Sequence, residues 1–142
     1  MMKKVAVCYW SSTGNTQAMA EAVEAGARNA GADVTVFTAA EFDASKMDEF
    51  DAVAFGCPAM GAEELESDEF EPMFTACESK LSGKPIALFG SYGWGDGEWM
   101  STWENTCRGD GADLVCDSVI CQEAPDEEAA AACNRLGAAL AQ

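Results

Sequence analysis

The chain has 142 residues, a length that fits one compact domain spanning residues 1–142. Its 25 acidic and 8 basic residues give a net charge of −17, which disfavours binding to nucleic acid and to anionic membranes. No apolar run approaches the roughly 20 residues that span a bilayer, and the apolar stretch after Lys3 and Lys4 is too short for a signal peptide. We therefore expect a cytoplasmic protein.

Apolar runs and helical stretches alternate along the chain. The expected strands are Lys4 to Tyr9, Asp33 to Thr38, Ala52 to Cys57, Pro85 to Ser91, and a fifth formed by Asp113 to Cys116 and Ser118 to Cys121, with Asp117 as a candidate interruption. The expected helices are Thr16 to Ala30, Asp43 to Phe50, Ser67 to Leu81, Glu98 to Arg108 and Asp126 to Ala141. Continuously apolar strands are typical of sheets buried on both faces. The alternation predicts an α/β fold with a doubly wound, five-stranded parallel sheet and helices on both faces.

The seven cysteines do not form a metal-binding pattern. Their number is odd, none forms a Cys-x-x-Cys pair, and the chain contains no histidine to complete a zinc site. Several cysteines lie in apolar runs. We therefore expect reduced cysteines that pack as small apolar residues, and no metal site.

The loop after the first expected strand has the composition of an anion site without a cation. The stretch "SSTGNT" joins a strand to a helix, where unpaired backbone amides and the helix dipole favour an anion. It lacks the lysine of a phosphate-binding P-loop and is not a dinucleotide fingerprint, so it is expected to anchor a phosphate rather than to transfer one. An ordinary helix cap is the alternative. The candidate donors are Ser11, Ser12, Thr13, Asn15 and Thr16, with backbone amides around Gly14.

Two further loops follow the third and fourth strands, at the edge where doubly wound sheets bind ligands. In "SYGWGDGEW", Trp94 lies between two glycines and is free to stack on a flat ring, or else covers the core. In "CPAMGAEE", Met60 is a soft apolar group that could cover the other face of that ring. Trp99 and Trp103 lie one helical turn apart and are expected to pack between helix and sheet. The loops together predict a ligand with a phosphate at one end and a planar ring at the other.

On these residues the chain resembles the short-chain flavodoxins, which carry FMN. The matching stretches are "YWSSTGNT", "GCPAMG", "EFEPMF", "ALFGSYGWGDGEWM" and "EAPDE", and they occur in order over nearly the whole chain. The resemblance implies a flavodoxin-like fold and a low-potential one-electron carrier, not an enzyme. This carrier would use non-covalently bound FMN, mainly between its semiquinone and hydroquinone.

The resemblance also assigns roles to individual residues. It places Met60 and Trp94 on the two faces of the flavin ring. It also implies that the Gly61 carbonyl accepts a hydrogen bond from N5–H of the semiquinone. Ala62 follows that glycine where relatives often carry glycine, aspartate, asparagine or serine, and Pro58 replaces a serine found in some relatives. The implied cofactor-binding residues are Ser11, Ser12, Thr13, Gly14, Asn15, Thr16, Pro58, Ala59, Met60, Gly61, Ala62, Glu63, Ser91, Tyr92, Gly93, Trp94, Gly95 and Gln122.

Other functions of the same fold stay open at this point. A small flavin-dependent NAD(P)H or quinone reductase is the main alternative, although 142 residues leave little room for a wider site and a dimer interface. A module that binds another nucleotide is a further alternative, whereas a receiver domain would need an acidic cluster after the first strand. For a carrier we expect a monomer that meets redox partner proteins with basic docking surfaces transiently. The candidate docking rim is Glu63, Glu64, Glu66, Asp68 and Glu69, which could equally be a solvated helix start.

Overall fold

A computed structural model describes residues 2–60, 64–93 and 95–142. Its parallel sheet has the strand order β2-β1-β3-β4-β5, and β6 also pairs with β4. The strands are β1 (Lys4–Tyr9), β2 (Asp33–Thr38), β3 (Ala52–Gly56), β4 (Pro85–Tyr92), β5 (Asp113–Leu114) and β6 (Val119–Gln122). The order reverses between β1 and β3, as in a doubly wound sheet, which confirms the predicted fold class.

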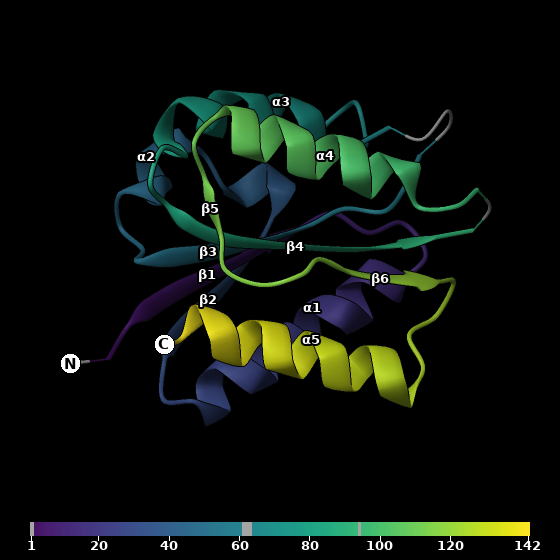
Figure 1. Cartoon of the computed structure of the whole chain (residues 1–142), viewed down its shortest axis with the longest axis horizontal. Coiled ribbons are helices and arrows are strands. Elements are labelled where there is room, and N and C mark those ends of the chain that lie inside the picture. Colours follow the sequence, from purple (N-terminus) through teal and green to yellow (C-terminus); the bar gives the residue numbers. More distant parts are fainter. Residues whose placement is uncertain (1, 61–63, 94) are drawn as a thin grey trace.

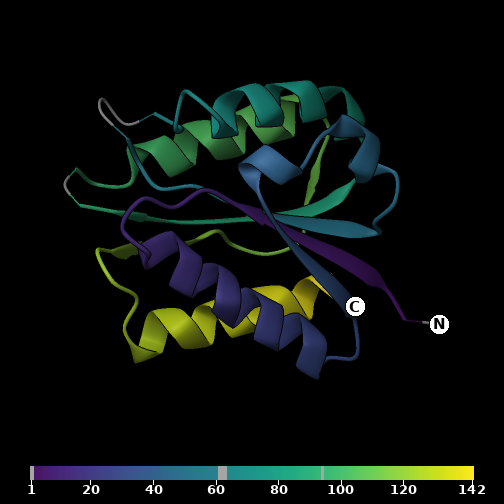
Figure 2. The same ribbon diagram turned by 180° about the vertical axis from the view of Figure 1, so that it is seen from behind.

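Helices cover both faces of this sheet. They are α1 (Asn15–Asn29), α2 (Ala44–Met47), α3 (Phe70–Cys77), α4 (Glu98–Gly109) and α5 (Glu127–Leu140), with short 3-10 turns at Ala39–Glu41 and Glu78–Lys80. The helices α3 and α4 lie on one face, and α1 and α5 lie on the other (Figures 1 and 2). In the part of the chain that the structure describes, no helix is both long enough and apolar enough to cross a membrane.

The predicted third helix is wrong at its ends. It was expected from Ser67 to Leu81, but α3 begins at Phe70 and ends at Cys77, where a 3-10 turn takes over. The cause at the start is the carboxylate of Glu66, which accepts hydrogen bonds from the amides of residues 68, 69 and 70. These bonds hold a turn ahead of the helix, as a capping residue does.

The predicted fifth strand is interrupted, but over more residues than Asp117. Asp113 and Leu114 pair with the start of β4, and Val119 to Gln122 pair with its end. The two pieces therefore occupy one edge of the sheet in succession (Figure 1). The carboxyl end of β6 brings the last loop of the chain beside the ends of β3 and β4.

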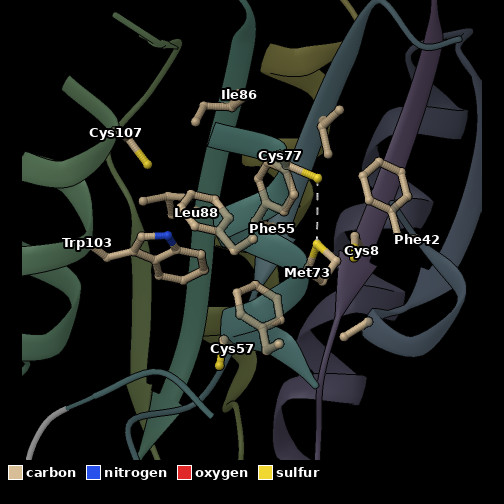
Figure 3. Close-up of a cluster of buried hydrophobic side chains, with 14 of the residues drawn as sticks. Cys8, Phe42, Phe55, Cys57, Met73, Cys77, Ile86, Leu88, Trp103 and Cys107 are labelled. Atoms are coloured by element: carbon tan, nitrogen blue, oxygen red, sulfur yellow. Dashed lines mark hydrogen bonds between the residues drawn. The ribbon is translucent and has the colours of Figure 1, made fainter. Parts of the chain in front are cut away.

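Each face of the sheet has its own core. Between the sheet and α3 and α4, aromatic rings meet edge to face, as Phe74 does with Phe55 at 5.1 Å and with Trp103 at 5.6 Å. Trp99 and Trp103 are both buried, which confirms that they pack between helix and sheet. Figure 3 shows the cysteine side chains of this core among the rings, with the Cys77 thiol facing the sulfur of Met73.

All seven cysteines are free thiols, and five of them are buried. Burial raises the pKa of Cys57 and Cys133 to about 12, so both remain protonated near neutral pH. A protonated, enclosed thiol is a poor nucleophile and a poor metal ligand. The buried cysteines thus pack as small apolar residues, as predicted.

On the other face, α1 and α5 pack with their backbones in contact. A Cβ atom at Gly26 of α1 would lie 2.0 Å from the carbonyl oxygen of Asn134 in α5, so only glycine fits there. The Asn134 side chain also donates a 2.7 Å hydrogen bond to the carbonyl of Ala22. These contacts fix the axis of α1, and with it the position of the loop at its N-terminus.

Candidate cofactor cleft

Residues from the ends of four strands, β1, β3, β4 and β6, meet at the carboxyl edge of the sheet and enclose a cleft of about 470 Å³. This volume lies within the range of small-molecule binding sites. The loop before α1 forms one wall, the loop after β3 forms another, and the end of β4 lies between them. The described lining residues are Ser12, Thr13, Asn15, Pro58, Ala59, Met60, Ser91, Tyr92, Gly93, Glu123 and Ala124.

The loop before α1 leaves backbone amides unpaired at the cleft. Gly14 adopts a left-handed conformation with φ of 95°, and its N–H donates to the Ser11 hydroxyl at 3.1 Å. The helix receives no side-chain cap, and its first backbone bond runs from Ala18 N–H to the Gly14 carbonyl. The amides of Asn15, Thr16 and Gln17 therefore have no partner among the described residues, which is the arrangement that holds an anion at a helix N-terminus.

A buried pair of hydroxyls joins this loop to β4. The Thr16 and Ser91 oxygens lie 3.1 Å apart, and both residues are buried. Thr16 does not line the cleft, because its side chain lies beneath the loop. The pair fixes the start of α1 against the strand that carries the ring end of the cleft.

The loop after β3 is held by β4 and α4. The amides of Cys57 and Ala59 donate to the carbonyls of Phe89 and Ser91, at 3.1 Å and 3.0 Å. The indole N–H of Trp99 donates to the Cys57 carbonyl at 3.2 Å. The loop therefore continues along β4 beyond the last residue of β3, which carries Met60 to the cleft.

Met60 and Glu64 are paired across the segment that separates them. The amide of each donates to the carbonyl of the other, at 2.8 Å and 3.0 Å, in an isolated antiparallel bridge. The predicted site residues Gly61, Ala62 and Glu63 lie between these two and are outside the described residues, as is Trp94.

Glu66 is a buried carboxylate at the base of this loop. Its side chain accepts hydrogen bonds of 2.7 to 2.8 Å from the amides of Asp68, Glu69 and Phe70. Burial raises the pKa of Glu66, but the three amide bonds outweigh it and the net shift is downward. The prediction that Glu66 belongs to an exposed docking rim is therefore wrong. Glu66 is buried, and its carboxylate accepts hydrogen bonds from the amides at the start of α3.

The last loop contributes two residues that were not among the predicted site residues. Glu123 and Ala124 line the cleft, and the Glu123 amide donates to the Tyr92 carbonyl at 2.8 Å. Glu123 has a φ of 60°, the left-handed region that non-glycine residues seldom adopt. Gln122, a predicted site residue, donates from its side chain to the Gly93 carbonyl at 3.2 Å and supports the loop without lining the cleft.

The structure thus brings most of the described predicted residues together. Predicted residues that line the cleft are Ser12, Thr13, Asn15, Pro58, Ala59, Met60, Ser91, Tyr92 and Gly93. Predicted residues that are described but lie outside its lining are Ser11, Gly14, Thr16, Gly95 and Gln122. The signal that could have revealed Glu123 is its position directly after Gln122, within one loop at the carboxyl end of the edge strand.

Neutral donors dominate the electrostatics of the cleft. Among its described lining residues, Glu123 carries the only formal charge. A phosphate here would be held by amides, hydroxyls and the dipole of α1, without a cation. A larger hollow of about 720 Å³ lies between β6 and α5. The smaller cleft is the candidate cofactor site, because of these two spaces it is the one whose described lining includes both the uncapped start of α1 and a methionine.

The chain is similar in sequence and in fold to known proteins. The flavodoxin family model matches residues 7–137. The flavodoxin of Megasphaera elsdenii is 44% identical over 97% of this chain and 98% of its own, and that of Clostridium beijerinckii is 44% identical over 85% and 88%. The solution structure of two-electron reduced M. elsdenii flavodoxin superposes with a TM-score of 0.89 at 45% identity, covering 96% of this chain and 98% of that one. The chain therefore belongs to the flavodoxin family, whose members are electron carriers that bind FMN.

Proposed function

We propose that this protein is a low-potential one-electron carrier that holds FMN in the cleft at the carboxyl edge of its sheet. The observation that carries the proposal is the uncapped start of α1, where Asn15 has an unpaired amide and lines one cleft with Met60 and Tyr92. Such an amide suits a phosphate, and the apolar groups suit a flat ring. When bound, FMN supplies the redox chemistry, and the protein supplies binding and electrostatics.

The phosphate end rests on the loop from Ser11 to Thr16. The unpaired amide of Asn15 would bind the phosphate together with the hydroxyls of Ser12 and Thr13, and all three residues line the cleft. The Thr16–Ser91 contact would support them from below. Because the described residues here carry no positive charge and the protein has a net charge of −17, salt should screen repulsion and strengthen FMN binding, in contrast to sites that use lysine or arginine.

The ring end rests on the loops after β3 and β4. Met60 and Tyr92 line the cleft, and Tyr92 packs on the buried Trp99 with 5.6 Å between ring centroids. The predicted roles of Trp94, Gly61 and Glu63 remain part of the proposal, as they lie outside the described residues.

The low potential follows from charge. The second electron adds negative charge to a cofactor beside Glu123, in a protein of net charge −17. Added charge of the same sign is disfavoured, most strongly where water is excluded. The surroundings should therefore lower the potential of the second electron relative to that of free FMN.

We further propose that electron-transfer partners with basic surfaces dock on an acidic rim beside the cleft, made of Glu64, Asp68 and Glu69. All three are exposed, whereas Glu66 is buried. Glu69 accepts a 3.1 Å hydrogen bond from the indole N–H of Trp10, which orders this end of the rim. The carrier would act as a monomeric, single-domain protein of the cytoplasm.

Spectroelectrochemical titration of the FMN-loaded protein tests the proposal. We expect two separate one-electron steps, with the second below the corresponding potential of free FMN. Glu123→Gln should raise the second potential. Asp33→Asn removes the same charge from the amino end of β2 and should change it far less. A colourless protein that takes up no added FMN, or a second potential equal to that of free FMN, would contradict the proposal.

The reductase alternative is not favoured. Full-length relatives of closely similar size are flavodoxins, and the chain covers 98% of the M. elsdenii protein. A carrier needs a partner at each turnover, whereas a reductase oxidises its own substrate. Steady NAD(P)H oxidation by the purified FMN-loaded protein would restore this alternative.

A further inference from the structure

The strand β6 lies at the edge of the sheet with one side unpaired. Among the described strands it pairs with β4 alone, through Val119 to Gln122 (Figure 1). Backbone groups of successive residues in a strand point to opposite sides. The amide of Glu123 donates to the Tyr92 carbonyl of β4, so the amides and carbonyls of Ile120 and Gln122 point away from the sheet. Unpaired edge groups of this kind are a template for an additional strand.

A hollow of about 720 Å³ follows this edge. It is lined by Val119 and Cys121 of β6, and by Ala132 and Leu136 of α5. Ile120 also lines it, although its exposed side chain extends toward Gly97 at the start of α4, on the other face of the sheet. An added strand would therefore find backbone partners along the edge and apolar surface for alternate side chains, which is the usual form of strand-addition recognition.

The charged residues around the hollow favour a basic binding partner over a second copy of this chain. Asp117, Asp126 and Glu128 line it, against the single cation Arg135. A second copy of this chain would bring the same carboxylates face to face and would add another net charge of −17. Like charges brought together oppose association, whereas lysine or arginine side chains would be attracted.

The hollow also adjoins the cofactor cleft. Tyr92 and Ala124 line both, and β6 ends at Gln122 beside the cleft. A strand added along β6 would therefore hold its parent protein next to the predicted flavin. This position suits a protein that exchanges electrons with the cofactor.

We infer that the β6 edge and the hollow beside α5 bind an extended, basic segment of a partner protein, by addition of a strand to the sheet. The identification of the partner as an electron-transfer protein rests on the proposed function. The strand addition itself depends only on the free edge, the apolar hollow and its acidic rim.

A synthetic peptide tests the strand addition on the FMN-loaded protein. The probe is a nine-residue peptide that alternates lysine and valine. We expect binding that weakens with salt, together with slowed hydrogen exchange at the amides of Ile120 and Gln122. A peptide with glutamate in place of lysine should not bind, and N-methylation of the backbone should weaken binding about tenfold or more, because several edge hydrogen bonds are lost.

A matched pair of variants separates the edge from the rest of the protein. Ile120→Pro removes an outward-pointing N–H and should weaken peptide binding about three- to tenfold, the loss of one hydrogen bond. Ile120→Val keeps that N–H and should bind like the original protein. The flavin absorbance spectrum reports folding of each variant and tests the proposed cofactor site separately.

Three results would overturn the inference, and the first two would show attraction by charge alone. The first is unchanged exchange at Ile120 and Gln122 when the lysine–valine peptide binds, and the second is equally tight binding of the N-methylated peptide. The third is a concentration-dependent dimer of the protein alone that protects the same two amides, which would assign the edge to a second copy.

Discussion

Replacement of Glu66 tests how one buried carboxylate holds both α3 and the loop that leads to Met60. One oxygen, Oε1, accepts from the amides of Glu69 at 2.8 Å and Phe70 at 2.7 Å, and Oε2 accepts from Asp68 at 2.8 Å. In Glu66→Ala the buried Phe70 amide loses its partner at a cost of about 1–3 kcal/mol, and water replaces the bonds of the other two at about 0.5 kcal/mol each. The expected loss of unfolding free energy is about 2–4 kcal/mol.

The free energy of unfolding should fall less in Glu66→Gln than in Glu66→Ala. The amide oxygen can still accept from Glu69 and Phe70, but the NH₂ group then faces the amide of Asp68, and one charge-assisted bond becomes a repulsive contact. We expect a loss of about 1–2 kcal/mol. Urea unfolding at a fixed excess of FMN measures both variants. Glu71→Gln removes an exposed acid from the first turn of α3 and serves as the control.

The effect of pH has a definite sign. The folded-state pKa of Glu66 lies below its ordinary value of 4.5, so its ionised form is favoured by folding. This stabilisation is fully present above about pH 4.5 and is lost as pH falls through the folded pKa. In Glu66→Gln the acid-induced loss should be smaller. If Glu66→Ala unfolds within about 0.5 kcal/mol of the Glu71→Gln control, the capping argument is refuted.

Three further predictions concern other parts of the chain. Burial, together with a hydrogen bond and charge repulsion from Asp110, raises the pKa of Glu78 to about 7, so the folded state binds more protons than the unfolded state and stability should fall as pH rises from about 4.5 to 7. Solvent screens this pair, so Glu78→Gln should remove only on the order of 1 kcal/mol of that fall in stability. Urea unfolding at several pH values between about 4.5 and 7 measures the effect, and an unchanged dependence of stability on pH would contradict it. Glu123→Gly should stabilise the protein by about 0.5–1 kcal/mol in thermal unfolding by relieving a φ of 60°, whereas Glu123→Ala, which removes the same acid, should not. If the turn at Gly61 and Ala62 is type II in the reduced protein, Ala62 occupies its positive-φ position, where alanine costs roughly 1 kcal/mol more than glycine. Ala62→Gly should then raise the potential of the first electron by a few tens of millivolts, and an unchanged or lowered potential in redox titration would refute this.

The sequence was sufficient for the first four strands and for most of the cleft, for a physical reason. Buried parallel strands are apolar on both faces, so runs such as Ala52 to Cys57 stand out without any tertiary information. Loops at their carboxyl ends must meet, because parallel strands end at one edge. Ser12, Met60 and Tyr92 therefore come together although they are far apart in the chain.

Features set by single side-chain conformations were not predictable. The start of α3 at Phe70 depends on where the Glu66 carboxylate points, and within an acidic run that residue resembles any solvated acid. The left-handed conformation of Glu123 has no signal in its residue type, because glycine or asparagine would be expected there. Thr16 carries a hydroxyl that could bind phosphate, and the sequence places it in the predicted phosphate loop. In the structure that hydroxyl instead lies against the Ser91 hydroxyl in the interior.

The distribution of thiols has a practical consequence for spectroscopy and labelling. Cys116 and Cys121 are half-buried, whereas the other five cysteines are enclosed in the two cores. Both half-buried thiols line the hollow at β6, and burial raises the pKa of each. Under mildly alkaline conditions an alkylating dye should therefore react first at these two positions. The native protein thus carries its own reporters at this edge, and shielding from the dye would register an arriving partner without any engineered residue.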